Sequence, residues 1–185
     1  SQMAGIYDIR SWSNIVTAHL ISGPDIVDGL QAGWSDVGRE GGVLLLAQMS
    51  SRGNLLTENY CDSVVAKGVA SEGVLGFIGN GSRPEELQKL RAMVGESKMI
   101  WTPGVNLVVG DGEMGQRYGG PKEAVIAGSD CIIVGSGIHR ADNPAASLSL
   151  CPGNHDHPPE QVAVKDASPG SASGETGDKP TRLLL

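Results

Sequence analysis

Five short apolar runs alternate along this chain with segments of helical spacing, and this alternation constrains the fold more than any other feature of the sequence. The runs span residues 14–20, 43–49, 74–78, 99–102 and 131–134. Short strands that alternate with helices over brief connections predict a parallel sheet with right-handed crossovers, which is an α/β fold. Because the run 14–20 is rich in β-branched residues, we expect it to be a strand buried on both faces.

The segments between the runs have typical signals of helix boundaries. One helix is expected to begin at Pro24 and Asp25 and to stop near Gly33, because proline and an acidic residue suit the first turn and glycine suits the end. A second helix is expected from Thr57 onward. A third helix, over 84–94, is amphipathic, and we expect its inward side chains to be Leu87, Leu90 and Met93. A short fourth helix is expected over 121–127.

The stretch from Met99 to Ile138 contains the clearest candidate for a binding site. A buried strand ends at Thr102-Pro103-Gly104, and the glycine-rich loop G-D-G-E-M-G-Q-R-Y-G-G-P follows. A second buried strand then ends at Gly135-Ser136-Gly137. Small and polar residues at neighbouring strand ends are how α/β folds build phosphate sites, using backbone N–H groups.

Size and charge exclude several classes of protein. The 185 residues suffice for one domain but fall short of the roughly 250 residues of a complete (β/α)8 barrel. A net charge of −7 argues against nucleic-acid binding, and no apolar run is long enough to span a membrane. Cys61 and Cys131 lie in apolar runs, so we expect buried thiols in a reducing compartment, namely the cytoplasm.

The composition changes after Ala146. Five of the ten prolines lie in 151–185, mixed with glycine, serine and aspartate, and no periodic apolar pattern remains. Such a segment cannot bury enough surface to offset its ordering entropy. We therefore expect one domain over 1–146 and a disordered tail over 147–185. Because the chain starts at Ser1, we also expect a fragment, and the tail is typical of a splice variant or a frameshift.

Four motifs in order resemble orotidine 5′-phosphate decarboxylase in its eukaryotic form, as in the C-terminal half of UMP synthase. They are S-W-S-N-I-V-T-A-H-L-I-S-G-P, L-L-L-A-Q-M-S-S-R-G-N-L, T-P-G-V with G-D-G-E-M-G-Q-R-Y, and S-D-C-I-I-V-G-S-G-I. The resemblance implies a partial (β/α)8 TIM barrel, approximately strands 4 to 8. It also implies a homodimer that binds OMP and UMP and uses no cofactor. Another phosphate-binding barrel is disfavoured by Q-M-S-S-R-G together with G-Q-R-Y.

The resemblance assigns roles to individual residues. Ser50 corresponds to the serine that hydrogen-bonds the pyrimidine ring, and Pro103 to the proline that lines the base pocket. Gln116 and Tyr118 correspond to residues of the loop that closes over the phosphate, with Arg117 between them. Gly135 corresponds to the glycine whose backbone faces the phosphate, and Ser136 follows it.

Two departures bear on activity. The family's catalytic lysine and aspartates lie in a D-x-K-x-x-D motif, and this chain contains none. Ser136 stands where the family places an arginine that grips the phosphate. Four lysines are expected on helices or loops and not at the carboxyl ends of strands, namely Lys67, Lys89, Lys98 and Lys122.

Two functions of different classes therefore remain open. The chain is a piece of the decarboxylase that is inactive alone, or it is a non-catalytic nucleotide-binding or dimerising isoform. We expect no metal site, because His155 and His157 lack a third anchored ligand, and no catalytic role for His19.

Overall fold

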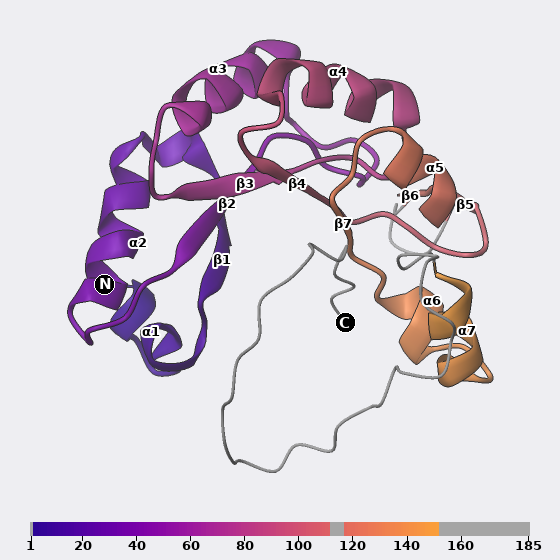
Figure 1. Cartoon of the computed structure of the whole chain (residues 1–185), viewed down its shortest axis with the longest axis horizontal. Coiled ribbons are helices and arrows are strands. Elements are labelled where there is room, and N and C mark those ends of the chain that lie inside the picture. The colour runs from indigo at the N-terminus through magenta and orange to yellow at the C-terminus, as the bar shows by residue number, and fades with distance from the viewer. Residues whose placement is uncertain (1, 112–116, 152–185) are drawn as a thin grey trace.

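The structure, a computed structural model, describes residues 2–111 and 117–151. It contains one parallel sheet whose strands lie side by side in chain order, each paired to the next (Figure 1). The five strands are β1 (Ile15–Ala18), β2 (Gly42–Leu46), β3 (Val74–Ile78), β4 (Met99–Thr102) and β7 (Cys131–Ile132). A small antiparallel pair, β5 (Gly110–Asp111) and β6 (Arg117–Tyr118), lies between β4 and β7 in the sequence.

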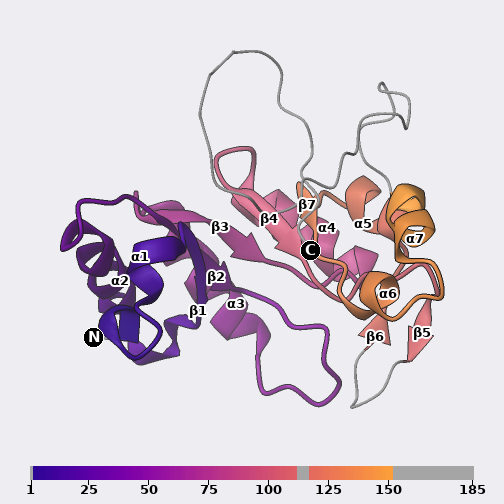
Figure 2. The ribbon, with the colours of Figure 1, turned by 90° about the horizontal axis from the view of Figure 1, so that it is seen from below.

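The larger helices cover one side of this sheet. Figure 1 shows them as an arc around the outer side of the strands. They are α2 (Asp25–Ser35), α3 (Glu58–Val69), α4 (Pro84–Val94) and α5 (Pro121–Ile126). Shorter helices are η1 (Gln2–Ala4), α1 (Ile9–Trp12), η2 (Leu20–Ser22), α6 (Ser136–His139) and α7 (Pro144–Leu150). In the turned view of Figure 2, α1 and α2 lie at one end of the molecule, and α5, α6 and α7 lie at the other.

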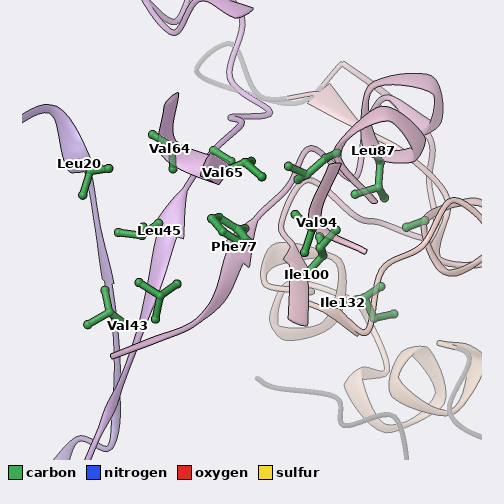
Figure 3. Close-up of a cluster of buried hydrophobic side chains, with 14 of the residues drawn as sticks. Leu20, Val43, Leu45, Val64, Val65, Phe77, Leu87, Val94, Ile100 and Ile132 are labelled. Carbon is green, nitrogen blue, oxygen red and sulfur yellow. The ribbon is translucent and has the colours of Figure 1, made fainter. Parts of the chain in front are cut away.

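The main hydrophobic core lies between the strands and this arc of helices. The strand register aligns Leu45, Phe77 and Ile100 in one row across β2, β3 and β4, and all three are fully buried. Figure 3 shows this row facing helix side chains, which include Val64, Val65, Leu87 and Val94. Each such side chain contributes roughly 1.5–3 kcal/mol when it leaves water, so this layer anchors the fold.

Gly68 sets the distance between α3 and the sheet. A Cβ atom at this position would lie 2.6 Å from the Phe77 ring and 3.0 Å from a Leu45 methyl group. Any larger residue would therefore push α3 away from the central strands.

The opposite face of the sheet is also apolar. Leu44, Ile78, Trp101 and Cys131 form a second buried cluster there, but none of the described helices covers this face (Figure 1). On β1, Ile15 and Thr17 are exposed. The expectation that 14–20 is buried on both faces is therefore wrong, because β1 is an edge strand and only its helix-facing side packs against a core.

The other sequence-based expectations are largely confirmed. The α/β class and its five parallel strands agree with the prediction, as do the bounds of β3, α4 and β4. Helix α2 continues past Gly33 to Ser35, and β2 ends at Leu46, before the predicted Met49. Met93 is 41% exposed and Val94 is buried, so the inward stripe of α4 ends at Val94 and the prediction for Met93 is wrong.

Several short elements were not anticipated, among them β5, β6, α6 and α7. Helix α7 continues past the predicted boundary at Ala146 to Leu150. The remainder of the predicted tail, 152–185, lies outside the described residues. In the part of the chain that the structure describes, no helix is both long enough and apolar enough to cross a lipid bilayer.

We expect the isolated chain to associate in solution. Both outermost strands, β1 and β7, pair on one side only within the described sheet, and none of the described helices covers the inner apolar face. Unpaired strand edges beside apolar surface promote pairing with other chains. Size-exclusion chromatography with light scattering should show species larger than a monomer.

A charge on the exposed side of β1 should reduce this association. Thr17→Lys places an ammonium at the open edge, whereas Asn59→Lys makes the same charge change on the exposed surface of α3. Only Thr17→Lys should raise the monomer fraction. A monomeric wild-type chain that melts cooperatively would contradict the expectation.

Candidate functional site

A pocket of about 370 Å³ opens at the carboxyl ends of the strands. Because the strands are parallel, the loops that follow β2, β4 and β7 all emerge at the same edge of the sheet. Ser50 follows β2, Pro103 and Gly104 follow β4, and Gly135 and Ser136 follow β7, and all five line this strand-end pocket. The other lining residues are Leu46, Gln48, Met49, Ser51, Ile78, Val105, Tyr118 and Ile133.

Gly104 allows the loops after β2 and β4 to meet. Its φ of 76° lies in the left-handed region that favours glycine. A Cβ atom there would lie 2.5 Å from the Ser50 Cβ and 3.1 Å from the Arg117 carbonyl oxygen. Ser50 is 6% exposed, so Gly104 holds a buried serine hydroxyl at the pocket wall.

The β6 strand is fixed to the same edge by backbone hydrogen bonds. The Gly119 N–H donates to the Gly104 carbonyl at 2.9 Å, and the Asn106 N–H donates to the Gly119 carbonyl at 3.0 Å. These bonds place Tyr118 beside the end of β7, where its hydroxyl lies 3.1 Å from the Ser136 hydroxyl. Tyr118 and Ser136 thus form a hydrogen-bonded pair at the wall of the strand-end pocket.

Arg117 does not join the other predicted site residues. Successive side chains of a strand point to opposite faces, so Tyr118 lines the strand-end pocket while Arg117 lines a different cavity of about 540 Å³. This helix-side cavity lies between α3, α4 and the loop after β2. The Arg117 Nε atom is buried there without a hydrogen-bond partner.

The two hollows share a wall built around Gln48, a residue that sequence reasoning missed. Its amide nitrogen donates to the Glu86 carbonyl at 2.9 Å, and its amide oxygen accepts from the Asn80 N–H at 3.0 Å. The Asn80 side chain donates to the Glu86 carboxylate at 3.0 Å, which also pairs with Arg83. The sequence did contain a signal for this residue, namely a glutamine near the carboxyl end of the apolar run 43–49.

The remaining candidates lie away from the strand-end pocket. Lys67, Lys89 and Lys122 are exposed on α3, α4 and α5. Lys98 precedes β4 and donates to the carbonyls of Ser71 and Val74 at 2.8 and 2.6 Å, at the amino-terminal edge of the sheet. His19 is exposed after β1 and does not line the pocket.

Three predicted residues fall where the structure gives no description. Gln116, His155 and His157 lie outside the described residues. Within 2–111 and 117–151, no cluster of three or more histidine, cysteine or acidic side chains could hold a metal ion.

Comparison with known proteins agrees with this architecture. A family model described as Orotidine 5′-phosphate decarboxylase / HUMPS family matches residues 1–150. The chain belongs to this family. The same conclusion follows from individual relatives, all of them curated as orotidine 5′-phosphate decarboxylases.

The chain is 41% identical over 147 residues to the orotidine 5′-phosphate decarboxylase of Schizophyllum commune, covering 75% of this chain and 50% of the relative. It is 43% identical over 142 residues to that of Mycosarcoma maydis, covering 75% and 48%. For Saccharomyces cerevisiae the identity is 37% over 140 residues, covering 73% and 49%. The chain therefore spans about half the length of the curated relatives it matches.

Substitution of Gly104 should disturb this family member at its strand-end pocket. Gly104→Ala adds both left-handed backbone strain and a clash with Ser50, whereas Gly38→Ala adds strain alone, because no atom lies within 4 Å of its Cβ position. We expect Gly38→Ala to lower the free energy of unfolding by about 1 kcal/mol and Gly104→Ala by about 2–4 kcal/mol. Thermal denaturation measures both. Equal losses of unfolding free energy in the two variants would show that the contact with Ser50 adds no further destabilisation.

The Cys61 thiol should react slowly. Burial, with smaller contributions from the negative charges of Asp62, Glu86 and Glu58, raises its pKa to about 11. Because the thiolate is the nucleophile, a rise from 9.0 to about 11 leaves about one-hundredth of the usual thiolate at pH 8. The rate at which Cys61 is alkylated should rise about tenfold per pH unit from pH 8 to pH 10.

Iodoacetamide labelling followed by mass spectrometry measures this rate. Cys131 and Cys151 are buried. Labelling of the Cys61→Ser variant therefore measures the background reaction of these two thiols. Labelling of Cys61 at the rate of free cysteine at pH 8 would contradict the raised pKa.

Proposed function

We propose that this chain forms the pyrimidine-nucleotide-binding part of an orotidine 5′-phosphate decarboxylase, the carboxy-lyase that converts OMP to UMP in de novo pyrimidine biosynthesis. The single observation that supports this is the strand-end pocket. Side chains that are distant in sequence, including Ser50, Tyr118 and Ser136, line one hollow at the carboxyl ends of the strands. That edge is where (β/α)8 barrels place their active sites.

The lining suits a pyrimidine ring and a ribose. Ile78, Pro103 and Ile133 supply apolar surface, against which a flat ring can pack. Ser50 supplies a buried hydroxyl that can exchange hydrogen bonds with ring oxygen and nitrogen atoms. The hydroxyls of Ser51, Tyr118 and Ser136 lie along the same wall and suit the ribose.

We propose further that the isolated chain does not catalyse decarboxylation. Stabilising the carbanion requires an ammonium group aimed at the reacting carbon. The described residues that line the pocket include no lysine, and the D-x-K-x-x-D motif does not occur in the sequence. The chemistry would need residues from another segment or another chain.

A non-catalytic, dimerising isoform is the second candidate. The observation that favours it is the apolar face that none of the described helices covers, together with the outer edges of β1 and β7, which pair with no other strand of the described sheet. Either function would place the protein with the nucleotide pool of the cytoplasm. The three cysteines, which are all free thiols, are compatible with that reducing compartment.

The first experiment measures turnover and binding on the same preparation. Loss of OMP absorbance should not exceed the uncatalysed rate, while isothermal titration should detect UMP binding. Ser50→Ala should weaken UMP binding by about 5- to 10-fold, because one hydrogen bond contributes about 1 kcal/mol.

Ser63→Ala, on the exposed surface of α3, is the matched control and should bind UMP as the wild type does. Decarboxylation by the pure chain would contradict the proposed inactivity. Failure to bind UMP at millimolar concentration would contradict the nucleotide-binding function itself.

A further inference from the structure

Gln48 connects three parts of the strand-end edge. Its backbone N–H and that of Ala47 both donate to the Ile78 carbonyl, at 3.0 and 3.2 Å. Its side-chain amide accepts from the Asn80 N–H at 3.0 Å and donates to the Glu86 carbonyl at 2.9 Å. These hydrogen bonds join the end of β2 to the end of β3 and to the first turn of α4.

Asn80 holds the turn that follows β3. Its side-chain oxygen accepts from the N–H and the hydroxyl of Ser82, at 3.1 and 2.7 Å. Its side-chain nitrogen donates to the Glu86 carboxylate at 3.0 Å. Because Asn80 is 1% exposed, water does not compete for these bonds. The turn therefore has one defined position relative to the Gln48 amide.

The same turn supports β4 and β6. The Gly81 N–H donates to the Pro103 carbonyl at 3.1 Å. A Cβ atom on Gly119 would overlap the Gly81 carbonyl oxygen, so β6 packs against the turn by its backbone. A shift of the turn would therefore move both Pro103 and Tyr118, which line the strand-end pocket.

The influence of Gln48 on the strand-end pocket is indirect. Its amide oxygen and nitrogen are engaged by Asn80 and Glu86, which line the helix-side cavity. Ser50 lies two residues further along the chain and is packed against Gly104. The place of its hydroxyl thus depends on where the end of β2 lies relative to the loop after β4. Binding groups must be held within about 0.5 Å of their productive position.

We propose that Gln48 is a positioning residue for UMP binding, which fixes the Ser50 hydroxyl in the strand-end pocket through its bonds to Asn80 and Glu86. This inference rests on the proposed nucleotide-binding function and adds a residue that acts on the site without contacting the ligand. Loss of the Gln48 amide should therefore weaken binding only while the Ser50 hydroxyl is present.

Gln48→Met is the first test, because it keeps the length of the side chain and removes both amide hydrogen bonds. UMP binding, measured by isothermal titration, should weaken by about 5- to 10-fold, as for Ser50→Ala. Circular dichroism confirms that each variant is folded.

Gln31→Met is the matched control. Gln31 is also half-buried, and its amide donates to the Gly41 and Gly73 carbonyls at 2.9 and 3.1 Å, at the amino-terminal edge of the sheet. Both substitutions remove two side-chain hydrogen bonds, so each should lower the melting temperature by roughly 4–8 °C. Only Gln48→Met should weaken UMP binding.

A double-mutant cycle separates positioning from direct contact. In the Ser50→Ala background, Gln48→Met should change the UMP dissociation constant by less than about twofold, because the hydroxyl that it positions is absent. If both residues contacted the ligand independently, their losses would combine to roughly 25- to 100-fold.

Ser82→Ala provides a milder test should Gln48→Met fail to fold. It removes the hydroxyl that donates to the Asn80 side chain and leaves the Ser82 N–H bond in place. UMP binding should weaken by about two- to threefold in the wild-type background and should not change in the Ser50→Ala background.

The outcomes separate this inference from the proposed function. Weakening by Gln48→Met that disappears in the Ser50→Ala background supports the inference. Equal UMP affinity of Gln48→Met and wild type, or additive losses in the cycle, overturns it and leaves the nucleotide-binding function intact. Equal weakening by Gln31→Met also overturns it, because lost stability would then explain the effect. Failure of the wild-type chain to bind UMP overturns both.

Discussion

The packing of the central strands against α3 and α4 is the constraint on which the rest of the structure depends. Leu45, Phe77 and Ile100 form one row in register, and the approach of α3 at Gly68 seals it from water. Parallel strands cannot be joined by tight hairpins, so each connection must cross back over the sheet. Because each crossover returns the chain to the same end of the sheet, the loops that follow the strands all emerge at the opposite edge.

The candidate site follows from that arrangement. The ends of β2, β4 and β7 come together because these strands are parallel members of one sheet, and not because the loops attract one another. Gly104 then permits a closer approach than any other residue would, since the space of its missing side chain is occupied by Ser50. The hydrogen bond from the Gly119 N–H to the Gly104 carbonyl attaches β6 to the same edge. The pocket is thus built by backbone geometry, with side chains supplying its chemical character.

Charge is distributed unevenly across this edge. The helix-side cavity contains carboxylates, guanidinium groups and a thiol whose pKa is raised to about 11, whereas the strand-end pocket contains hydroxyls and apolar groups. The network of Gln48, Asn80 and Glu86 forms the boundary between them. Among the described residues, those that line the strand-end pocket are therefore neutral, and the charged groups lie on the other side of the wall around Gln48.

The sequence alone determined the α/β class, the five parallel strands and five of the described residues that line the pocket, namely Ser50, Pro103, Tyr118, Gly135 and Ser136. These depend on local periodicity and on motifs at strand ends, and such signals are present in short windows of sequence. The edge position of β1, the exposure of Met93 and the separation of Arg117 from Tyr118 were decided only by the tertiary structure. Each of these depends on what lies across the sheet or on the alternation of a two-residue strand. A glycine-rich loop has no hydrophobic pattern from which that strand could be predicted, because its hydrogen-bond partners are distant in sequence.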